Sequence, residues 1–182
     1  TTSSSRSRRP EPRRSQVSAP DQRVIGVDPG LVATGYAVVE AGGRATRVLN
    51  TGVVQTRAEE SLEDRVRQVF EGVSTVLDAY SPSFLVLEDL YMEYRFPRTA
   101  LLMAHARGVI CLAASQRKMS FMALAPAVVK RAIAGNGAAS KQQIQLGIQR
   151  ILGLEAPPRS THVADALALA VTGLLRAGAS IA

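Results

Sequence analysis

An apolar run that follows an amphipathic helix constrains the fold of this chain more than any other feature. Residues 84–88 (FLVLE) are almost entirely apolar, as in a strand that is covered on both faces of a sheet. The preceding residues 60–79 have helical periodicity, and Ser81-Pro82 ends that helix. A strand, a helix and a second strand predict a right-handed crossover between parallel neighbours. The apolar face of the predicted helix comprises Leu62, Val66, Val69, Val73, Val76 and Leu77.

Three predicted strands precede this helix. Residues 23–28 (RVIGVD) form a short β-branched run that ends at Pro29-Gly30, as a strand does when it enters a turn. Residues 35–40 and 45–55 read as two further strands, and Gly42-Gly43 is the hairpin turn between them. The chain therefore opens with three antiparallel strands.

The rest of the chain alternates helices with one more strand. The patterns predict a helix over 99–116, a strand over 119–124 and helices over 126–134, 141–153 and 162–176. Ser140 and Thr161 are the expected N-caps of the last two helices. The predicted order βββαβαβααα favours an α/β fold with a mixed five-stranded sheet and helices packed on both faces.

The ends of the chain differ from its middle. Residues 1–22 are Ser-, Arg- and Pro-rich, and we expect a disordered basic tail there, although this bias also resembles an organellar transit peptide. The folded domain is predicted over 23–178, with a short C-terminal tail over 179–182. The single Cys111 fits a reducing compartment. We expect no secretory signal and no membrane span, because Thr99 to Ser115 is short for a bilayer and carries charge.

Charge is distributed unevenly along the chain. Residues 21–92 carry six basic and eleven acidic side chains, whereas residues 93–182 carry eleven basic and three acidic ones. A basic half of this kind favours a polyanionic partner such as nucleic acid, although a solvated surface without a partner also explains it.

Carboxylates close two of the predicted strands. Asp28 ends the first strand and Glu88 ends the fourth, so parallel neighbours would bring both to the sheet edge where ligands usually bind. His162 and Asp165 lie three residues apart at the start of the last helix and share one face. Such a cluster would repel itself unless divalent cations neutralised it, and two hard cations there can promote phosphodiester hydrolysis. A turn-forming Asp28 and ordinary first-turn helix residues are the simpler interpretations.

The order of several motifs resembles that of the RuvC-type Holliday junction resolvases. Asp28-Pro29-Gly30, followed by Thr34-Gly35-Tyr36, resembles their first-strand motif, and Glu88 after FLVL resembles their second acidic motif. The resemblance covers roughly residues 23–176, and continues in order through Ala106-Arg107-Gly108, Lys130, Gly135-Asn136-Gly137, Lys141 and the closing HVADALALA.

This resemblance implies a ribonuclease-H-like fold and a crossover junction endodeoxyribonuclease of DNA recombination and repair. The enzyme would be a homodimer, because two equivalent cuts in a two-fold substrate need two equivalent sites. It would nick opposing strands of a four-way DNA junction symmetrically, with two Mg²⁺ or Mn²⁺ ions per active site. Its expected partners are junction DNA and the RuvA/RuvB branch-migration complex, and its expected location is the bacterial cytoplasm. The small, apolar helix 99–116 is the candidate for part of the dimer interface, with ordinary core packing as the alternative.

The resemblance also implies roles for individual residues. Lys130 and Lys141 match basic residues near the scissile phosphate, where Lys141 would also assist catalysis, and Arg107 is expected to bind DNA. Tyr91 falls where the family places an aromatic residue that wedges into the junction centre. Solvated lysines and a rim aromatic are the plainer interpretations. The implied metal-binding and catalytic set is Asp28, Glu88, His162 and Asp165.

The chain departs from the family pattern at two places. Many members have Asp where this chain has His162, and imidazole suits Mn²⁺ better than Mg²⁺, so we expect Mn²⁺ to be preferred. The segment 91–97 (YMEYRFP) is longer and more aromatic than usual, which leaves the contacts beyond Tyr91 open.

Three alternatives remain at this stage. A related nuclease acting on RNA or ordinary duplexes would carry the same site. A junction-binding protein in which His162 has abolished chemistry would bind DNA without cutting it. An actin-like or sugar-kinase-like ATPase needs a second large domain, and the chain is too short for one and has no GxxxxGK[ST] loop.

Overall fold

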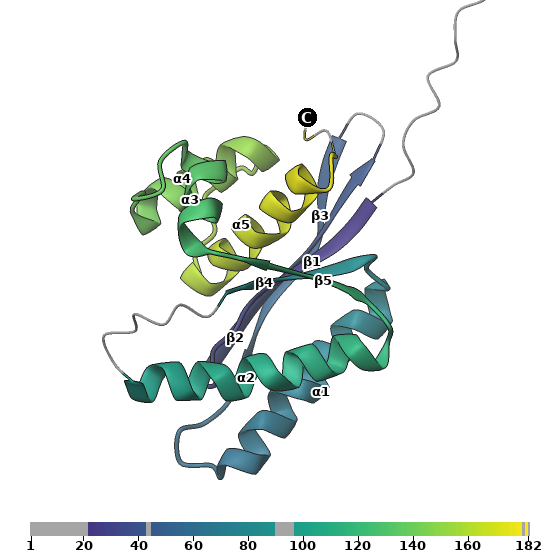
Figure 1. The fold of residues 1–182 in the computed structure, drawn as a ribbon. Coiled ribbons are helices and arrows are strands. Elements are labelled where there is room, and N and C mark those ends of the chain that lie inside the picture. The colour runs from purple at the N-terminus through teal and green to yellow at the C-terminus, as the bar shows by residue number, and fades with distance from the viewer. Residues whose placement is uncertain (1–21, 43–44, 90–96, 180, 182) are drawn as a thin grey trace, which may run out of the picture.

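The helices and strands follow the predicted order. The computed structural model describes residues 22–42, 45–89, 97–179 and 181 (Figure 1). The predicted tail, all but Gln22, lies outside these ranges, as do the second residue of the predicted hairpin turn and Tyr91. The elements are β1 (Gln22–Asp28), β2 (Ala33–Gly42), β3 (Ala45–Gln55), α1 (Leu62–Tyr80), β4 (Phe84–Glu88), α2 (Pro97–Gln116), β5 (Ser120–Leu124), α3 (Pro126–Ala134), α4 (Lys141–Leu152) and α5 (Thr161–Arg176).

The strands form one mixed sheet in the order β3-β2-β1-β4-β5. β1 pairs antiparallel with β2 and parallel with β4, and β4 pairs parallel with β5. Three antiparallel strands followed by two parallel additions were predicted, and the prediction is confirmed. Because β1 and β4 are parallel neighbours, Asp28 and Glu88 emerge at the same edge of the sheet, beyond the last paired residues Val27 and Leu87.

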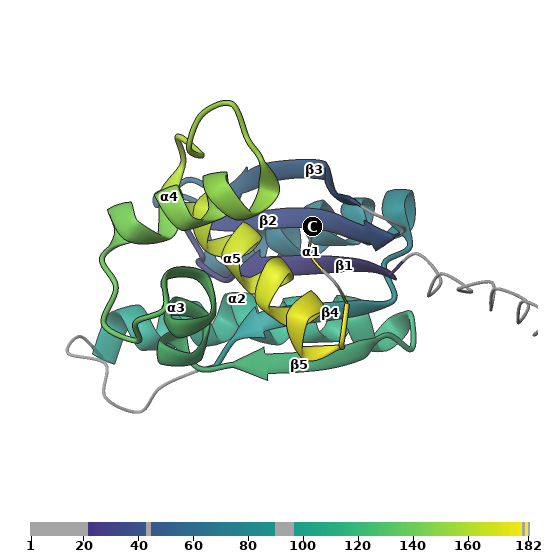
Figure 2. The ribbon, with the colours of Figure 1, turned by 90° about the horizontal axis from the view of Figure 1, so that it is seen from above.

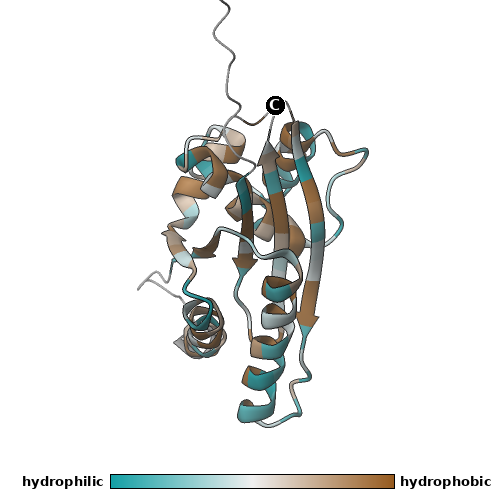
Figure 3. Cartoon of the chain, turned by 90° about the vertical axis from the view of Figure 1, so that its right-hand side faces the viewer, coloured by the Kyte–Doolittle hydropathy of each residue, from teal (hydrophilic) through white to brown (hydrophobic). Residues whose placement is uncertain are grey.

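Helices cover both faces of the sheet, as Figure 2 shows. Alternate residues of β1 and β4 point to opposite layers: Val24 and Val86 pack under α3, α4 and α5, whereas Ile25 and Leu85 pack under α1 and α2. The apolar run 84–87 is therefore buried on both sides, which explains its lack of alternation. Figure 3 shows the hydrophobic residues concentrated on the strands, with hydrophilic residues on the outer turns of the helices.

Two glycines allow α5 to lie directly on the sheet. A methyl group at Gly26 of β1 would overlap the backbone of Ala166 and Ala170, and one at Gly35 of β2 would overlap the backbone of His162. Only glycine permits this close approach. The first turn of α5, which carries His162 and Asp165, is thereby held against the ends of β1 and β2.

Polar caps set the helix boundaries. Ser140 and Gln143 form a reciprocal capping box at the start of α4, as Ser140 was predicted to do. The prediction that Thr161 caps α5 was wrong by one residue: the Ser160 hydroxyl accepts from the Val163 backbone N–H, and Thr161 is the first helical residue. Both residue types cap well, so the sequence alone did not separate these adjacent positions.

Helix α2 is less completely covered than its composition suggested. Leu101 and Leu112 on this helix are 62% and 50% exposed, and Phe121 on the neighbouring edge strand β5 is 45% exposed. Among the described residues, no helix combines the length and hydrophobicity needed to cross a bilayer. At the C-terminus, Ala179 and Ile181 of the predicted tail pack against the α5 side of the core.

Candidate active site

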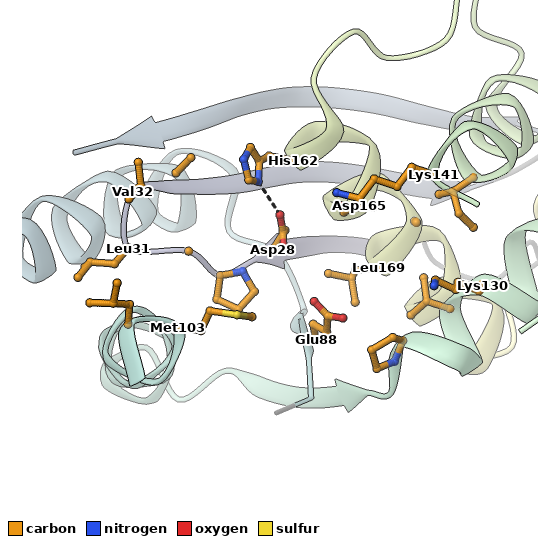
Figure 4. Close-up of a pocket in the computed structure, with 18 residues that line it drawn as sticks. Asp28, Leu31, Val32, Glu88, Met103, Lys130, Lys141, His162, Asp165 and Leu169 are labelled. Carbon is orange, nitrogen blue, oxygen red and sulfur yellow. Dashed lines mark hydrogen bonds and ion pairs between the residues drawn. The ribbon is translucent and has the colours of Figure 1, made fainter. Parts of the chain in front are cut away.

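A cavity of about 720 Å³ opens where β1 and β4 end (Figure 4). Its polar lining comes from five elements and consists of residues that the sequence singled out: β1 and β4 contribute two carboxylates, and α3, α4 and α5 contribute the rest. These residues are Asp28, Glu88, Lys130, Lys141, His162 and Asp165. The structure therefore brings together six residues that are up to 137 positions apart in the chain.

Asp28 and His162 form the one direct polar contact that the structure gives between these six side chains. His162 Nδ1 lies 2.9 Å from Asp28 Oδ2, and the Asp28 side chain is only 14% exposed. Burial raises the pKa of Asp28, whereas the hydrogen bond to His162 and the charges of His162 and Lys141 lower it, with a net upward shift. The close contact between Gly35 and the His162 backbone puts the imidazole in reach of β1.

Glu88 and Asp165 are coupled to Asp28 by charge. Burial first, and then the negative charges of Asp28 and Asp165, raise the pKa of Glu88 to about 7. Burial and the charge of Asp28 likewise raise the pKa of Asp165. The three acids share one partly desolvated space. The negative charge of each therefore disfavours the ionisation of its neighbours. Folding alone does not favour such an arrangement.

Two lysines offset part of this negative charge. Lys130 of α3 and Lys141, the first residue of α4, both lower the pKa of Glu88 and Asp165 through their charge. Figure 4 shows both lysines at the cavity margin on the side away from α2. Lys141 is exposed, so its ammonium group can reach an anion outside the protein while it faces the acids.

The donor set suits divalent cations. Among the described residues, no three His, Cys, Asp or Glu side chains are close enough as they stand to hold one metal ion. Even so, Asp28, Glu88 and Asp165 supply carboxylate oxygens, the ligands that Mg²⁺ and Mn²⁺ prefer. A cation between them would remove both the repulsion and the unfavourable burial that raise their pKa values. The residues present therefore fit such an ion by their chemistry.

The apolar wall of the cavity was not foreseen from the sequence. Leu31 and Val32 of the β1–β2 loop and Leu102 and Met103 of α2 form part of this wall. Nothing in a short loop of this composition marks it as part of a site. Ile144 could have been found, because it lies one helical turn after Lys141 on the same face of α4.

Hydrogen bonds hold the β1–β2 loop in place. Thr56, just after β3, donates from its backbone N–H to Val32 O at 3.0 Å and from its hydroxyl to Leu31 O at 2.5 Å. The buried Arg65 of α1 donates from Nε to the Thr56 hydroxyl at 3.0 Å, and Thr34 bonds back to Gly30 O at 2.7 Å. The loop that follows Asp28 is thus tied to two other elements.

Of the other two predicted DNA-binding residues, only Arg107 is among the described residues. Tyr91 is outside the described residues, so its role stays a prediction. Arg107 of α2 does not line the cavity, and its guanidinium donates to the backbone carbonyl of Glu88 at 2.8 Å. Asp89, the residue after Glu88, also lies outside the cavity lining.

A comparison with protein families matches this chain over residues 24–173 to the model described as "Crossover junction endodeoxyribonuclease RuvC". A protein of that name from Rhodopirellula baltica is 41% identical over 150 residues, which are 82% of this chain and 84% of the relative. Its counterpart from Corynebacterium efficiens is 42% identical over 156 residues, which are 85% of this chain and 70% of the relative.

Solved structures agree in fold. The structure described as "T. thermophilus RuvC in complex with Holliday junction substrate" superimposes with a TM-score of 0.80 at 35% identity, covering 86% of this chain and 94% of that one. The yeast mitochondrial Holliday junction resolvase Ydc2 superimposes with a TM-score of 0.60 at 17% identity, covering 86% of this chain and 79% of that one. At that identity the second likeness supports the fold alone.

Proposed function

The chain belongs to the RuvC family of crossover junction endodeoxyribonucleases, and we propose that it resolves four-way DNA junctions by paired, symmetric, metal-dependent nicks. One observation carries this proposal: three coupled carboxylates and two lysines share a single cavity at the ends of β1 and β4. Acids without arginine partners suit cations, and lysines beside them suit a phosphate backbone.

In this proposal Asp28, Glu88, His162 and Asp165 hold two divalent ions. When bound, such ions lower the pKa of a water molecule and stabilise the oxygen that leaves phosphorus. The protein's part is to orient these ligands. His162 uses Nδ1 for Asp28 and so keeps the Asp28 carboxylate in a fixed direction. Because imidazole is a softer ligand than carboxylate, we propose that Mn²⁺ supports faster cleavage than Mg²⁺.

Lys130 and Lys141 are proposed to bind the phosphate on either side of the cleaved bond. Both border the acids, and Lys141 is exposed where a strand of DNA would approach. An ammonium group at this place stabilises the negative charge that grows on the phosphate oxygens. It also lowers the repulsion between the phosphate and the three carboxylates.

Pairing of the two nicks requires a second copy of the chain. A two-fold substrate is cut symmetrically only if two sites are related by the same symmetry. The exposed Leu101 and Leu112 of α2 support our proposal that this helix forms part of a homodimer interface. Family membership further supports the proposals that the RuvA/RuvB branch-migration complex is a partner and that the bacterial cytoplasm is the place of action.

The test is cleavage of a mobile four-way junction in Mn²⁺, with each strand labelled in turn. We expect nicks at symmetric positions in two opposing strands, and ends that a DNA ligase rejoins. Linear duplex and RNA–DNA hybrid of the same sequence should be cut far more slowly. Faster cutting of the hybrid or duplex would favour a related nuclease of the same fold, and salt-sensitive junction binding without nicks would favour a non-catalytic binding protein.

A further inference from the structure

The backbone just beyond Glu88 is held from both sides. On one side the N–H of Asp89 donates to Leu124 O of β5 at 2.9 Å, which extends the β4–β5 ladder by one residue. On the other side β1 has already ended its pairing with β4 at Leu87. The carbonyl of Glu88 therefore lacks a partner in β1, and Arg107 takes that place by donating from Nη1 at 2.8 Å. One peptide unit thus has its N–H and its C=O fixed by different elements.

The Arg107 side chain is committed to this position. It is only 15% exposed, its Nη2 lies 3.7 Å from Asp89 Oδ1, and its Cζ lies 5.4 Å from the centre of the Phe121 ring. A planar guanidinium can face a ring while it donates in its own plane, which a lysine cannot do. These contacts occupy the N–H groups and the planar face through which an arginine would otherwise bind a phosphate.

The peptide that Arg107 holds determines where Glu88 points. Fixing the carbonyl of a residue fixes its ψ angle, and with it the direction in which Cβ leaves the strand. At Glu88 this matters more than at an interior strand residue, because Glu88 is the last residue of β4 and the β1 ladder no longer constrains it. A carboxylate that is displaced by even about 1 Å loses much of its value as a ligand.

We propose that Arg107 is a positioning residue of the cleavage reaction, which orients the Glu88 carboxylate through the Glu88 backbone carbonyl rather than by binding DNA. This inference rests on the proposed function for the reaction itself. The part that concerns Glu88 is independent of the substrate and is measured without DNA.

Two substitutions test the role. Arg107→Lys keeps the charge but cannot reproduce the geometry, and Arg107→Met removes the donors while keeping an apolar stem against Phe121. For both we expect Mn²⁺ affinity, measured by calorimetry on the DNA-free protein, to fall about ten- to hundredfold. The single-turnover cleavage rate should fall by a similar factor at subsaturating Mn²⁺ and recover in part at high Mn²⁺. Junction affinity, measured in Ca²⁺, should stay within about twofold of the wild-type value.

Arg117→Met is the matched control. This arginine, just after α2, bonds Asp78 at 2.6 and 2.7 Å and the carbonyl of Ala113 at 2.9 Å, and it does not line the cavity. It should change neither Mn²⁺ affinity nor cleavage. If an Arg107 variant weakens junction binding while Mn²⁺ affinity is unchanged, Arg107 is a DNA contact and the inference is overturned. Unchanged Mn²⁺ affinity together with an unchanged rate overturns it as well.

The same design separates this inference from the proposed function. Wild-type protein that binds Mn²⁺ but leaves four-way junctions intact would refute junction cleavage, and the Arg107 variants would still decide the positioning role by their Mn²⁺ affinity. If Arg107→Met does not fold, as judged by circular dichroism, Arg107→Lys and Phe121→Leu decide the question. Phe121→Leu removes only the ring beneath the guanidinium, and a Mn²⁺ affinity intermediate between the wild-type and Arg107→Lys values supports the proposal.

Discussion

Two groups of little-exposed carboxylates lie in the same sheet, and their surroundings are opposite. Glu40 of β2 accepts from Arg23 Nη2 at 2.7 Å and from Arg47 Nη2 at 2.9 Å, and the two guanidinium groups cover it. The hydrogen bond from Arg23 holds the pKa of Glu40 below its usual value. At the other end of β1, burial and mutual charge raise the pKa values of Asp28 and Glu88.

This difference separates an acid that stabilises the fold from acids that await a ligand. Glu40 is ionised and paired, so it completes its interactions within the chain. Among the described residues, the Glu88 carboxylate has no hydrogen-bond partner, and the cations that lower its pKa are the two lysines at the cavity margin. A chain selected for stability alone would have paired or replaced such a group.

The largest expected effect is that of Asp28→Asn on cleavage. An amide has lost the negative charge that holds a cation, and several kcal/mol of transition-state stabilisation correspond to a rate loss on the order of a thousandfold. Junction affinity in Ca²⁺-free buffer should change by less than about threefold, because the basic surface is unaltered. A single-turnover assay in Mn²⁺ measures the rate. Near-normal cutting by the variant would contradict the assignment of Asp28 to the acids that serve function.

Glu40→Gln is the matched change at the acid that stabilises the fold. It should leave the cleavage rate within about twofold of the wild-type value and lower the free energy of unfolding by roughly 1 kcal/mol, since both arginines remain partly solvated. Urea denaturation gives the stability change. A cleavage defect without loss of stability would contradict the distinction between Glu40 as a structural acid and the cavity residues as functional acids.

The second prediction concerns the stability of the metal-free protein as a function of pH. The pKa of Glu88 is about 7 in the folded chain and 4.5 ordinarily, so the folded state binds the proton more tightly. The resulting stabilisation is complete below pH 4.5 and is lost as the pH rises through 7, by roughly 3 kcal/mol at most. Raised pKa values at Asp28 and Asp165 act in the same direction. Glu40, with its lowered pKa, is ionised in both states above pH 5.5 and contributes nothing to this difference.

Melting temperatures in EDTA at pH 5.5 and pH 8 measure this effect. Wild-type protein should melt lower at pH 8, and Glu88→Gln should reduce the difference because it cannot ionise. Adding Mn²⁺ at pH 8 should restore the wild-type melting temperature and affect the variant much less, since a ligand stabilises only the state that binds it. A wild-type melting temperature that is flat between these pH values would contradict the raised pKa of Glu88.

The strands that hold the cavity were predictable because their patterns depend on burial. Residues 84–87 are apolar on both sides since helices cover both faces, and that pattern is legible in one sequence. The meeting of Asp28 and Glu88 followed from two parallel strands with an acid at the end of each. The proximity of His162 was an inference from helical spacing, whereas its bond to Asp28 depends on the close packing of α5 on Gly35.

Other parts of the site could not be read from the sequence. The family resemblance implied that Arg107 binds DNA, and nothing local in the sequence indicates whether its guanidinium faces solvent or turns back to a strand. Its contact with Glu88 depends on how α2 lies across β4, which is a tertiary property. The same holds for the buried Arg65 and Thr56, whose hydrogen bonds support the β1–β2 loop from 25 and more residues away.

The third prediction is that Lys141→Ala slows cleavage about ten- to hundredfold, as the loss of one group that stabilises developing charge would do. It should also reduce the slope of junction affinity against salt concentration by about one ion, since one phosphate contact is lost. Lys118→Asn is the control: Lys118 is exposed, has a positive φ of 53° that Asn tolerates, and does not line the cavity. Equal effects of the two variants would mean that Lys141 contributes only to the general basic surface.

The smallest expected effect is a change in metal preference. His162→Asp replaces the imidazole with a fourth carboxylate, so the ratio of the Mn²⁺ rate to the Mg²⁺ rate should fall by a factor on the order of a few while both rates remain measurable. The variant also loses the hydrogen bond from His162 Nδ1 to Asp28, and a like charge takes its place, so the pKa of Asp28 should rise further.

Metal-free His162→Asp should therefore be less stable than the wild type at pH 8 and gain more stability from added metal. Its cavity acids would differ even more from Glu40, whose charge is paired within the chain. His105→Asn is the control, since His105 is an exposed residue of α2 that does not line the cavity and whose Nδ1 lies 2.7 Å from the carbonyl oxygen of Leu101. Rates in the two metals at matched ionic strength, with melting temperatures in EDTA, measure both effects. An unchanged metal ratio in His162→Asp would mean that the imidazole acts on Asp28 alone and leaves the choice of metal to the three carboxylates.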